Sequence, residues 1–250
     1  MKKINLKGKV AVISGGMGYV GQEVALQFVK AGIKVALIYN NTTKKEIDIF
    51  LKKLGNGSQA YKCDLAEINQ VNSVLNKIEK EMDQIYLCIH TAGIKPIRKQ
   101  IHLTSKSELD SQMSGAFVSA FNFLSVCTQK LKQNKCGVIL AITTIGVLIP
   151  GATRSLGAYI PAKFALQGML TMLKDELSPY NIRVYSVAPG FMDGGMNKDI
   201  PQAFKEIIIK NSITKKITSA KEVAKKILTI CENQNENRLT MPISPEYGLI

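Results

Sequence analysis

The segment Ser14-Gly15-Gly16-Met17-Gly18-Tyr19-Val20-Gly21 joins a short apolar run, 9–14, to an apolar-periodic segment that continues to Ala31. A glycine-rich turn between a strand and a helix lets backbone N–H groups approach a pyrophosphate, and the helix dipole favours the negative charge. A tight turn that binds no ligand is the alternative interpretation. We predict a dinucleotide site at this turn, with cofactor contacts from Gly15, Met17, Gly18, Tyr19, Val20 and Gly21.

Strands alternate with helices along the rest of the chain. We expect strands at 9–14, 34–39, 59–62, 85–89, 137–142, 182–188 and 238–242, and later helices at 44–54, 67–82, 106–133, 159–178, 202–210 and 220–232. This alternation predicts an α/β fold, a Rossmann-type doubly wound parallel sheet of about seven strands. No repeat or composition break divides the chain, so we expect residues 1–250 to form a single domain.

The chain is strongly basic, with 33 lysines and arginines against 19 aspartates and glutamates, a net charge of +14. Such a charge suggests nucleic acid as a partner. The lysines, however, occur as scattered pairs such as Lys52-Lys53 and Lys225-Lys226, without a long basic run that carries aromatic residues. We therefore expect no nucleic-acid partner, and attraction of anionic ligands such as a phosphorylated cofactor or an acidic carrier protein fits better.

The sequence shows no pattern typical of a membrane span or a metal site. No stretch reaches ~18 apolar residues, and no uninterrupted apolar segment follows the basic first residues. The five cysteines form no C-x-x-C pair, and His90 and His102 are the only histidines. We expect reduced thiols, no metal, no membrane partner and a cytoplasmic location.

The end of the second expected strand should meet the adenosine ribose of a dinucleotide, because ligands lie beyond the carboxyl ends of the strands in such sheets. An acidic residue there would hold the 2′-hydroxyl of NAD, but this chain continues as Asn40-Asn41-Thr42-Thr43 without an early acid. Thr43 and Glu46 form a capping-box pattern that places Lys44 and Lys45 in the first helical turn, where cations are unfavourable unless an anion binds. Two more solvated lysines are the alternative. We expect Asn40, Asn41 and Thr42 to contact the cofactor, with NADP(H) preferred and NAD(H) the alternative.

A second motif, Gly157-Ala158-Tyr159-Ile160-Pro161-Ala162-Lys163, opens the helix expected at 159–178. Tyr159 and Lys163 are four residues apart and so lie on one face of that helix. Pro161 is compatible with the first turn, whose N–H groups have no intrahelical partner. A lysine ammonium beside a tyrosine favours the phenolate and lowers a pKa that starts near ~10 toward the range useful for proton transfer. An incidental surface pair is the alternative.

Together, the glycine turn, the Tyr159/Lys163 pair and the α/β pattern resemble the short-chain dehydrogenase/reductase family, from about Lys7 to Glu232. The nearest likeness is its β-ketoacyl-acyl-carrier-protein reductase branch. Four further segments carry the resemblance: Cys63-Asp64-Leu65, His90-Thr91-Ala92-Gly93, Ile142-Thr143-Thr144-Ile145-Gly146 and Val187-Ala188-Pro189-Gly190-Phe191.

The resemblance implies hydride transfer from NADPH to a ketone, either a small carbonyl compound or a carrier-bound 3-oxoacyl group. Tyr159 would protonate the carbonyl oxygen, and Lys163 would hold the nicotinamide ribose and lower the tyrosine pKa. Thr144, with Thr143 as second candidate, would orient the substrate oxygen, and Gln112 would stand where the family holds a proton-relay water. The resemblance also implies cofactor contacts from Asp64, Leu65, Thr91, Ala92, Gly93, Pro189, Gly190 and Met192.

Several positions depart from the family pattern. Tyr19 replaces the middle glycine of the turn, Thr144 replaces a serine, and Gly194 stands where a threonine is expected to bind the carboxamide. Gln112, which is longer than the family's asparagine, together with Thr144 and Gly194, leaves an alternative, a catalytically weak dinucleotide-binding sensor or scaffold with the same fold. The Tyr–Lys spacing of four argues against the family's enoyl reductases, which separate the two residues further.

Two expectations concern the substrate and the assembly. Residues 191–215 should form a lid over the substrate, since binding loops lie at this edge of the sheet. The long helix at 106–133, with Phe117, Phe121 and Phe123, is a candidate surface for a homo-oligomer, a dimer or tetramer, as the family commonly forms. Packing of these side chains within one chain is the alternative.

Overall fold

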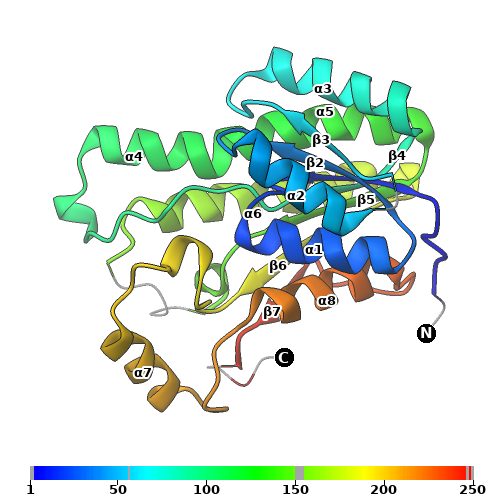
Figure 1. The fold of residues 1–250 in the computed structure, drawn as a ribbon. Helices are drawn as coiled ribbons and strands as arrows, with labels where there is room; N and C mark the ends of the chain where they lie inside the picture. The colour runs from blue at the N-terminus through cyan, green and yellow to red at the C-terminus, as the bar shows by residue number, and fades with distance from the viewer. Residues whose placement is uncertain (1–2, 56, 150–154, 246–247, 249–250) are drawn as a thin grey trace.

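The computed structural model describes residues 3–55, 57–149, 155–245 and 248. The other positions of the expected domain 1–250 lie outside the described residues. Within them the chain forms one sheet with helices on both faces (Figure 1). The α/β class and the single-domain organisation are confirmed.

In the described residues, seven parallel strands form the sheet, as the alternating pattern predicts. The strands are β1 (Val10–Ser14), β2 (Lys34–Tyr39), β3 (Gln59–Lys62), β4 (Ile85–His90), β5 (Gly137–Ile142), β6 (Ile182–Pro189) and β7 (Thr240–Ile243). Their order across the sheet is β3-β2-β1-β4-β5-β6-β7, and every neighbouring pair is parallel. The order reverses between β1 and β4, so the carboxyl ends of these two strands flank the position where such sheets bind ligands.

The helices cover the two faces of the sheet in separate layers. They are α1 (Tyr19–Lys30), α2 (Lys44–Leu54), α3 (Ile68–Met82), α4 (Lys106–Met113), α5 (Ser119–Asn134), α6 (Tyr159–Leu177), α7 (Gln202–Asn211) and α8 (Ala220–Glu232). Buried side chains of α1, α2 and α8 pack on one face, and those of α3, α5 and α6 pack on the other. Helix α7 lies away from both layers, toward the carboxyl ends of the strands (Figure 1).

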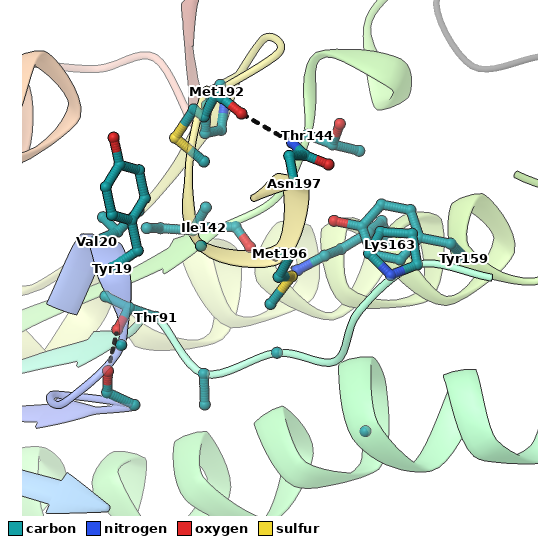
Figure 2. Close-up of a pocket in the computed structure, with 18 of the residues that line it drawn as sticks. Tyr19, Val20, Thr91, Ile142, Thr144, Tyr159, Lys163, Met192, Met196 and Asn197 are labelled. Carbon is teal, nitrogen blue, oxygen red and sulfur yellow. Dashed lines mark hydrogen bonds between the residues drawn. The ribbon is translucent and has the colours of Figure 1, made fainter. Parts of the chain in front are cut away.

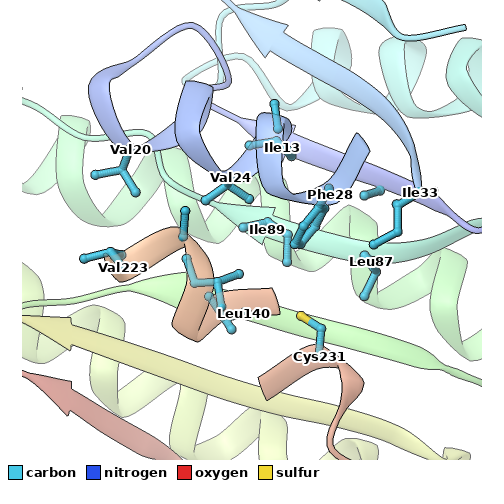
Figure 3. Close-up of a cluster of buried hydrophobic side chains, with 14 of the residues drawn as sticks. Ile13, Val20, Val24, Phe28, Ile33, Leu87, Ile89, Leu140, Val223 and Cys231 are labelled. Atoms are coloured by element: carbon cyan, nitrogen blue, oxygen red, sulfur yellow. The ribbon is translucent and has the colours of Figure 1, made fainter. Parts of the chain in front are cut away.

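The apolar periodicity of α1 accounts for its place in the core. Val20, Val24 and Phe28 recur at helical spacing and are buried, and they belong to one core cluster with Leu87 and Ile89 of the sheet (Figure 3). The central strands are buried on both faces, as parallel strands between two helix layers must be.

The single helix expected at 106–133 is interrupted. Between α4 and α5 the chain forms a π-helical turn, Ser114–Val118. Such a turn adds a residue to the helix and rotates the following side chains, and it occurs frequently at functional sites. After the turn, Leu124 is buried, whereas Phe121 is 48% exposed. Phe123, a candidate for an interface, is buried within the chain.

A polar network ties the middle of α6 to β6, to β7 and to the residue that follows β5. Ser186 of β6 is hydrogen-bonded to Thr143 (2.8 Å) and donates to Gln167 Oε1 (3.0 Å), and Gln167 Nε2 donates to Thr240 Oγ1 (2.9 Å). Because buried polar groups that are paired specify one arrangement, this network fixes α6 against β5, β6 and β7. In the described part of the chain, no helix is both long enough and apolar enough to cross a membrane.

Candidate functional site

A cavity of about 820 Å³ lies at the carboxyl ends of the strands and joins the two sequence motifs. The glycine turn lines one end, and Tyr159 and Lys163 of α6 line the other (Figure 2). Most predicted site residues line this cavity: Gly15, Gly18, Tyr19, Val20, Asn40, Asp64, Leu65, Thr91, Ala92, Gly93, Thr144, Tyr159, Lys163, Pro189, Gly190 and Met192. Its volume is within the ~300–1,000 Å³ range of small-molecule and cofactor pockets.

The glycine turn is packed so tightly that side chains would block it. A Cβ at Gly15, whose φ is +66°, would lie 2.6 Å from the Ala92 backbone, and one at Gly21 would lie 2.3 Å from the Gly15 carbonyl oxygen. Gly18 precedes the first turn of α1 and donates its N–H to the Gly15 carbonyl (2.8 Å). The turn therefore keeps backbone at the cavity wall beside a helix N-terminus, which fits a pyrophosphate group.

Two predicted residues of this turn support it from behind rather than facing the cavity. Gly21 allows the close approach of α1 to Gly15, and Met17 packs against the apolar core. Thr91 then fixes the turn to β4, because its hydroxyl donates to the carbonyls of Ser14 (2.7 Å) and Gly15 (3.2 Å).

Tyr19 and the pair Gly194-Gly195 form one contact across the mouth of the cavity. The tyrosine hydroxyl donates to the Asp193 carbonyl (2.9 Å). A Cβ at Gly194 would lie 2.6 Å from the tyrosine ring, and one at Gly195 would lie 2.8 Å from the Tyr19 Cβ. Tyr19 and Gly194, which both depart from the family pattern, therefore depend on each other, because the tyrosine ring occupies the space that a side chain at 194 would need.

The end of β2 carries the predicted helix cap. Thr43 accepts a hydrogen bond from the Glu46 N–H, and the Glu46 carboxylate accepts from the Thr43 N–H, which confirms the capping box. Asn40 lines the cavity, whereas Asn41 and Thr42 are not among the described lining residues. Lys44 and Lys45 occupy the exposed first turn of α2, as predicted.

Asp64 is positioned at the carboxyl end of β3 by its own loop. Its carboxylate accepts from the Ala66 N–H (3.0 Å), and its N–H donates to Gln70 Oε1 (3.0 Å). From α5, Asn122 donates to the carbonyls of Leu65 (3.0 Å) and Ala66 (2.9 Å). The buried amide of Asn122 therefore holds this loop at the cavity.

Tyr159 and Lys163 lie one helical turn apart at the start of α6, as their spacing predicts. The Lys163 ammonium lies 5.8 Å from the centroid of the Tyr159 ring and donates to the Ile142 carbonyl (2.9 Å). Burial lowers the pKa of Lys163 to about 8. The lysine is therefore a buried cation fixed to the end of β5.

The expected lowering of the tyrosine pKa by Lys163 is not what the structure shows. Burial raises the pKa of Tyr159 to about 12, and the charge that opposes this rise is that of Arg98. The reason is geometric, since the Lys163 ammonium points to the Ile142 carbonyl rather than forming a hydrogen bond with the phenol. Tyr159 is consequently protonated at neutral pH and available as a proton donor.

The two threonines after β5 differ in what their hydroxyls do. Thr143 is buried and its hydroxyl is committed to Ser186 (2.8 Å) and the Val187 carbonyl (3.3 Å). Thr144 is only partly buried and accepts a long hydrogen bond from the Gly146 N–H (3.5 Å). Of the two candidates, Thr144 has the hydroxyl that is freer to meet a substrate.

Gln112 is buried beside the site without lining the described cavity. Its Nε2 donates to the Lys95 carbonyl (3.1 Å), and its Oε1 has no hydrogen-bond partner among the described residues. A buried acceptor without a partner is costly. A water molecule at Oε1 would satisfy it, which is compatible with the relay expected at this position.

Arg98 and Asn197 are polar residues that line the cavity but lie outside the sequence motifs. Arg98 follows Gly93 in an irregular segment, and Asn197 belongs to a short 3₁₀ turn after β6. An Arg98 guanidinium nitrogen donates to Asn197 Oδ1 (3.0 Å). Three of the five residues 95–99 are basic, and composition alone does not say which of them faces the cavity.

The segment after β6 arches over the cavity. Met196 lies between the Tyr19 end and the Tyr159–Lys163 end, and Asn197 donates to the Met192 carbonyl (3.0 Å) (Figure 2). A Cβ at Gly93 would lie 2.8 Å from the Met196 side chain. No group of three or more histidine, cysteine, aspartate or glutamate side chains in the described ranges could hold a metal ion.

Comparison with known proteins extends over nearly the whole chain. A family profile described as enoyl-(acyl carrier protein) reductase matches residues 18–238. The sorbose reductase of Candida albicans is 29% identical over 194 residues, which cover 75% of this chain and 68% of that protein. The 3-oxoacyl-[acyl-carrier-protein] reductase of Thermotoga maritima is 25% identical over 253 residues, covering 99% of this chain and all of that protein.

A solved structure agrees in fold. The NADPH-dependent 3-quinuclidinone reductase from Rhodotorula rubra superposes with a TM-score of 0.86 at 24% identity, covering 98% of this chain and 92% of that one. At this identity the likeness concerns the fold alone.

Proposed function

The chain belongs to the short-chain dehydrogenase/reductase family, in its ketoreductase-like branch, and from this membership we propose that it is an NADPH-dependent reductase of ketones. The family consists of oxidoreductases in which a bound nicotinamide dinucleotide supplies the hydride. The observation that carries the proposal is that one cavity joins the glycine turn to Thr144, Tyr159 and Lys163.

The roles of the side chains follow from their positions. Tyr159 is protonated at neutral pH, and burial raises its pKa further. It donates a proton to the carbonyl oxygen while the carbonyl carbon is reduced, which gives the secondary alcohol. The Thr144 hydroxyl holds that oxygen in place. Lys163 binds ribose hydroxyls and places a positive charge near the phenolate that forms. Residues 191–215 act as a lid that excludes water.

The preference for NADPH rests on the end of β2. Asn40 rather than an acid lines the cavity there, and Lys44 and Lys45 stand in the first turn of α2. These groups suit a 2′-phosphate and leave a 2′-hydroxyl without a carboxylate partner. A small ketone or a carrier-bound 3-oxoacyl group is the proposed substrate.

The profile that matches the chain is described by an enoyl reductase activity, which would reduce a C=C bond instead. We favour ketone reduction because Tyr159 and Lys163 are one helical turn apart, as in the ketoreductase branch. A second candidate function is a catalytically weak sensor of the dinucleotide. The Gln112 amide supports it, because it donates to the Lys95 carbonyl instead of lining the described cavity.

A cofactor titration followed by a ketone assay tests the proposal. We expect NADPH to bind at micromolar concentration and more tightly than NADH, as followed by nicotinamide fluorescence. The double variant Lys44→Gln/Lys45→Gln should weaken NADPH binding about tenfold or more and leave NADH binding unchanged, since on this proposal the two charges attract only the 2′-phosphate. The matched control, Lys52→Gln/Lys53→Gln at the other end of α2, should change neither affinity.

The activity arm uses Tyr159→Phe. We expect it to lower kcat on a ketone panel by about 10²–10⁴-fold while NADPH still binds, because only the proton donor is lost. Equal inactivity of the wild type and Tyr159→Phe, with cofactor bound to both, would overturn the reductase and favour the sensor.

A further inference from the structure

Arg98 brings a cation into the substrate end of the cavity. Three described side chains with formal charge line the cavity: Asp64, Arg98 and Lys163. Asp64 lies beyond the carboxyl end of β3, where its carboxylate accepts from the Ala66 N–H. The Lys163 ammonium donates to the Ile142 carbonyl. Among the described residues no carboxylate forms an ion pair with Arg98, whose guanidinium donates to the neutral amide of Asn197. The cavity thus contains an arginine charge that the described protein does not neutralise.

The segment that carries Arg98 is docked on the start of α6. The Gly157 N–H donates to the Lys99 carbonyl (2.9 Å), and a Cβ at Gly157 would lie 2.7 Å from the Ile101 backbone. Gly157 comes two residues before Tyr159, so this close approach fixes Arg98 relative to the tyrosine. In agreement, the Arg98 charge opposes the burial that raises the pKa of Tyr159.

The lid fixes Arg98 from the other side. Asn197 accepts from Arg98 while donating its own side-chain amide to the Met192 carbonyl (3.0 Å). A guanidinium has five N–H donors, and this contact uses one of its nitrogens. Ile145, Leu156 and Phe204 add apolar surface to the same cavity. Arg98 is exposed, so its remaining N–H groups are accessible to an anion that enters there.

We propose that Arg98 binds an anionic group of the substrate, so that the ketone reduced at Tyr159 is an oxo acid or a phosphorylated ketone. Arginine binds the oxygens of carboxylate and phosphate groups in a bidentate geometry, and an oxo acid and a phosphorylated ketone each carry one of these groups. The inference rests on the proposed reductase function and names its substrate class. The net charge of +14 adds attraction for such anions at long range.

Matched pairs of substrates test the assignment with NADPH as cofactor. Acetoacetate is compared with methyl acetoacetate, and dihydroxyacetone phosphate with dihydroxyacetone, for the wild type, Arg98→Gln, Arg98→Lys and Lys95→Gln. Lys95 is the matched control, because it lies on the same segment and pairs with Asp199 of the lid (2.8 Å) but does not line the described cavity.

We expect the wild type to prefer the anionic member of one pair, which identifies carboxylate or phosphate. Arg98→Gln should reduce that preference in kcat/KM about 10- to 100-fold, mainly through KM, since a hydrogen bond to a charged group is lost. Arg98→Lys should keep part of the preference, and Lys95→Gln all of it. Melting temperatures show that each variant is folded.

An unchanged preference in Arg98→Gln, or no preference in an active wild type, would overturn the inference and leave the reductase intact. Inactivity of the wild type on all ketones would instead count against the reductase. A binding experiment that needs no turnover then tests the role of Arg98. The NADPH-bound protein is titrated with isobutyrate and with isobutyramide, and binding is followed by nicotinamide fluorescence. Tighter binding of the acid that is lost in Arg98→Gln supports the site, and equal binding or none overturns it.

Discussion

Lys163 is the side chain whose burial conflicts most with its charge. It is 4% exposed, and burial lowers its pKa to about 8 from an ordinary value of 10.5. Below pH 8 the lysine is charged in the folded and in the unfolded chain, so folding bears the full cost of burying the ammonium. Between pH 8 and 10.5 the unfolded chain binds more protons, and this contribution to stability therefore rises with pH.

We predict that Lys163→Met stabilises the ligand-free protein by about 1–3 kcal/mol at pH 7, less than the burial cost alone because the hydrogen bond to Ile142 is lost. The gain should shrink as the pH rises from 8 toward 10.5, and ketone reduction should be lost. Urea unfolding at several pH values measures both trends. Lys221→Met, at an exposed position of α8, is the control and should show no such pH dependence. A destabilised Lys163→Met at pH 7 would contradict this account.

Motif residues were predictable one by one because local spacing determines what they face. Tyr159 and Lys163 share a helix face by their separation alone, and Gly15 and Gly18 line the cavity because a strand ends there. Arg98 could not be predicted in this way. Its place depends on the contact between Gly157 and Ile101, two segments far apart in the sequence.

At the scale of elements, one polar side-chain pair connects the two strands that flank the switch point. Ser14 of β1 and His90 of β4 are register partners, and Ser14 Oγ is hydrogen-bonded to His90 Nδ1 (2.8 Å). His90 is fully buried, and its Nε2 has no partner among the described residues. Burial lowers the pKa of His90 to about 3, with a smaller contribution from the charge of Lys163.

This histidine should make the fold sensitive to acid. Below pH 6.5 the His90 imidazole is protonated in the unfolded chain, but in the folded chain it is protonated only near pH 3. The free energy of unfolding therefore falls as the pH falls. The contribution of His90 should be about 2–3 kcal/mol between pH 6.5 and about pH 4.5. We predict that His90→Asn reduces the pH dependence of unfolding in this window. The exposed His102, replaced in the same way, should leave the dependence unchanged, and identical slopes in wild type and His90→Asn would refute the prediction.

Helices and strands with a clear apolar period could be predicted from the sequence. The residues at which they end or are interrupted were harder to predict. The β2 and β5 bounds agree with the expected ranges, but the last strand begins at Thr240 instead of Arg238. There, Arg238 pairs with Glu236 within the preceding turn, a local contact that competes with the strand. The π turn at 114–118 has no sequence period of its own. Within this turn, Gly115 packs closely against Ile94, which belongs to a segment distant in the sequence.

At the scale of the whole molecule, large apolar side chains remain exposed on the α5–α6 layer. Phe121 of α5 is 48% exposed, and Phe164 and Met172 of α6 are 51% and 58% exposed. Exposed apolar side chains of this size favour association between copies. We therefore expect a homo-oligomer, a dimer or tetramer, that buries them.

Two substitutions test this expectation. Phe121→Glu/Phe164→Glu should produce a smaller species at micromolar concentration in sedimentation velocity, since charged groups at an interface core are strongly disfavoured. Ile49→Glu is the matched control, because Ile49 is 61% exposed on α2, in the opposite layer. The same mass for all three proteins would place the interface elsewhere or show a monomer.

The contact between Tyr19 and Gly194-Gly195 has a consequence for how such a chain can change over generations. With the tyrosine present, a threonine at 194 would collide with the ring, and with the ring removed first, the glycines would face a gap. Neither exchange alone restores a well-packed contact, so we expect the residues at 19 and 194 to change together. A comparison that scores the two positions separately would therefore count one packing arrangement twice.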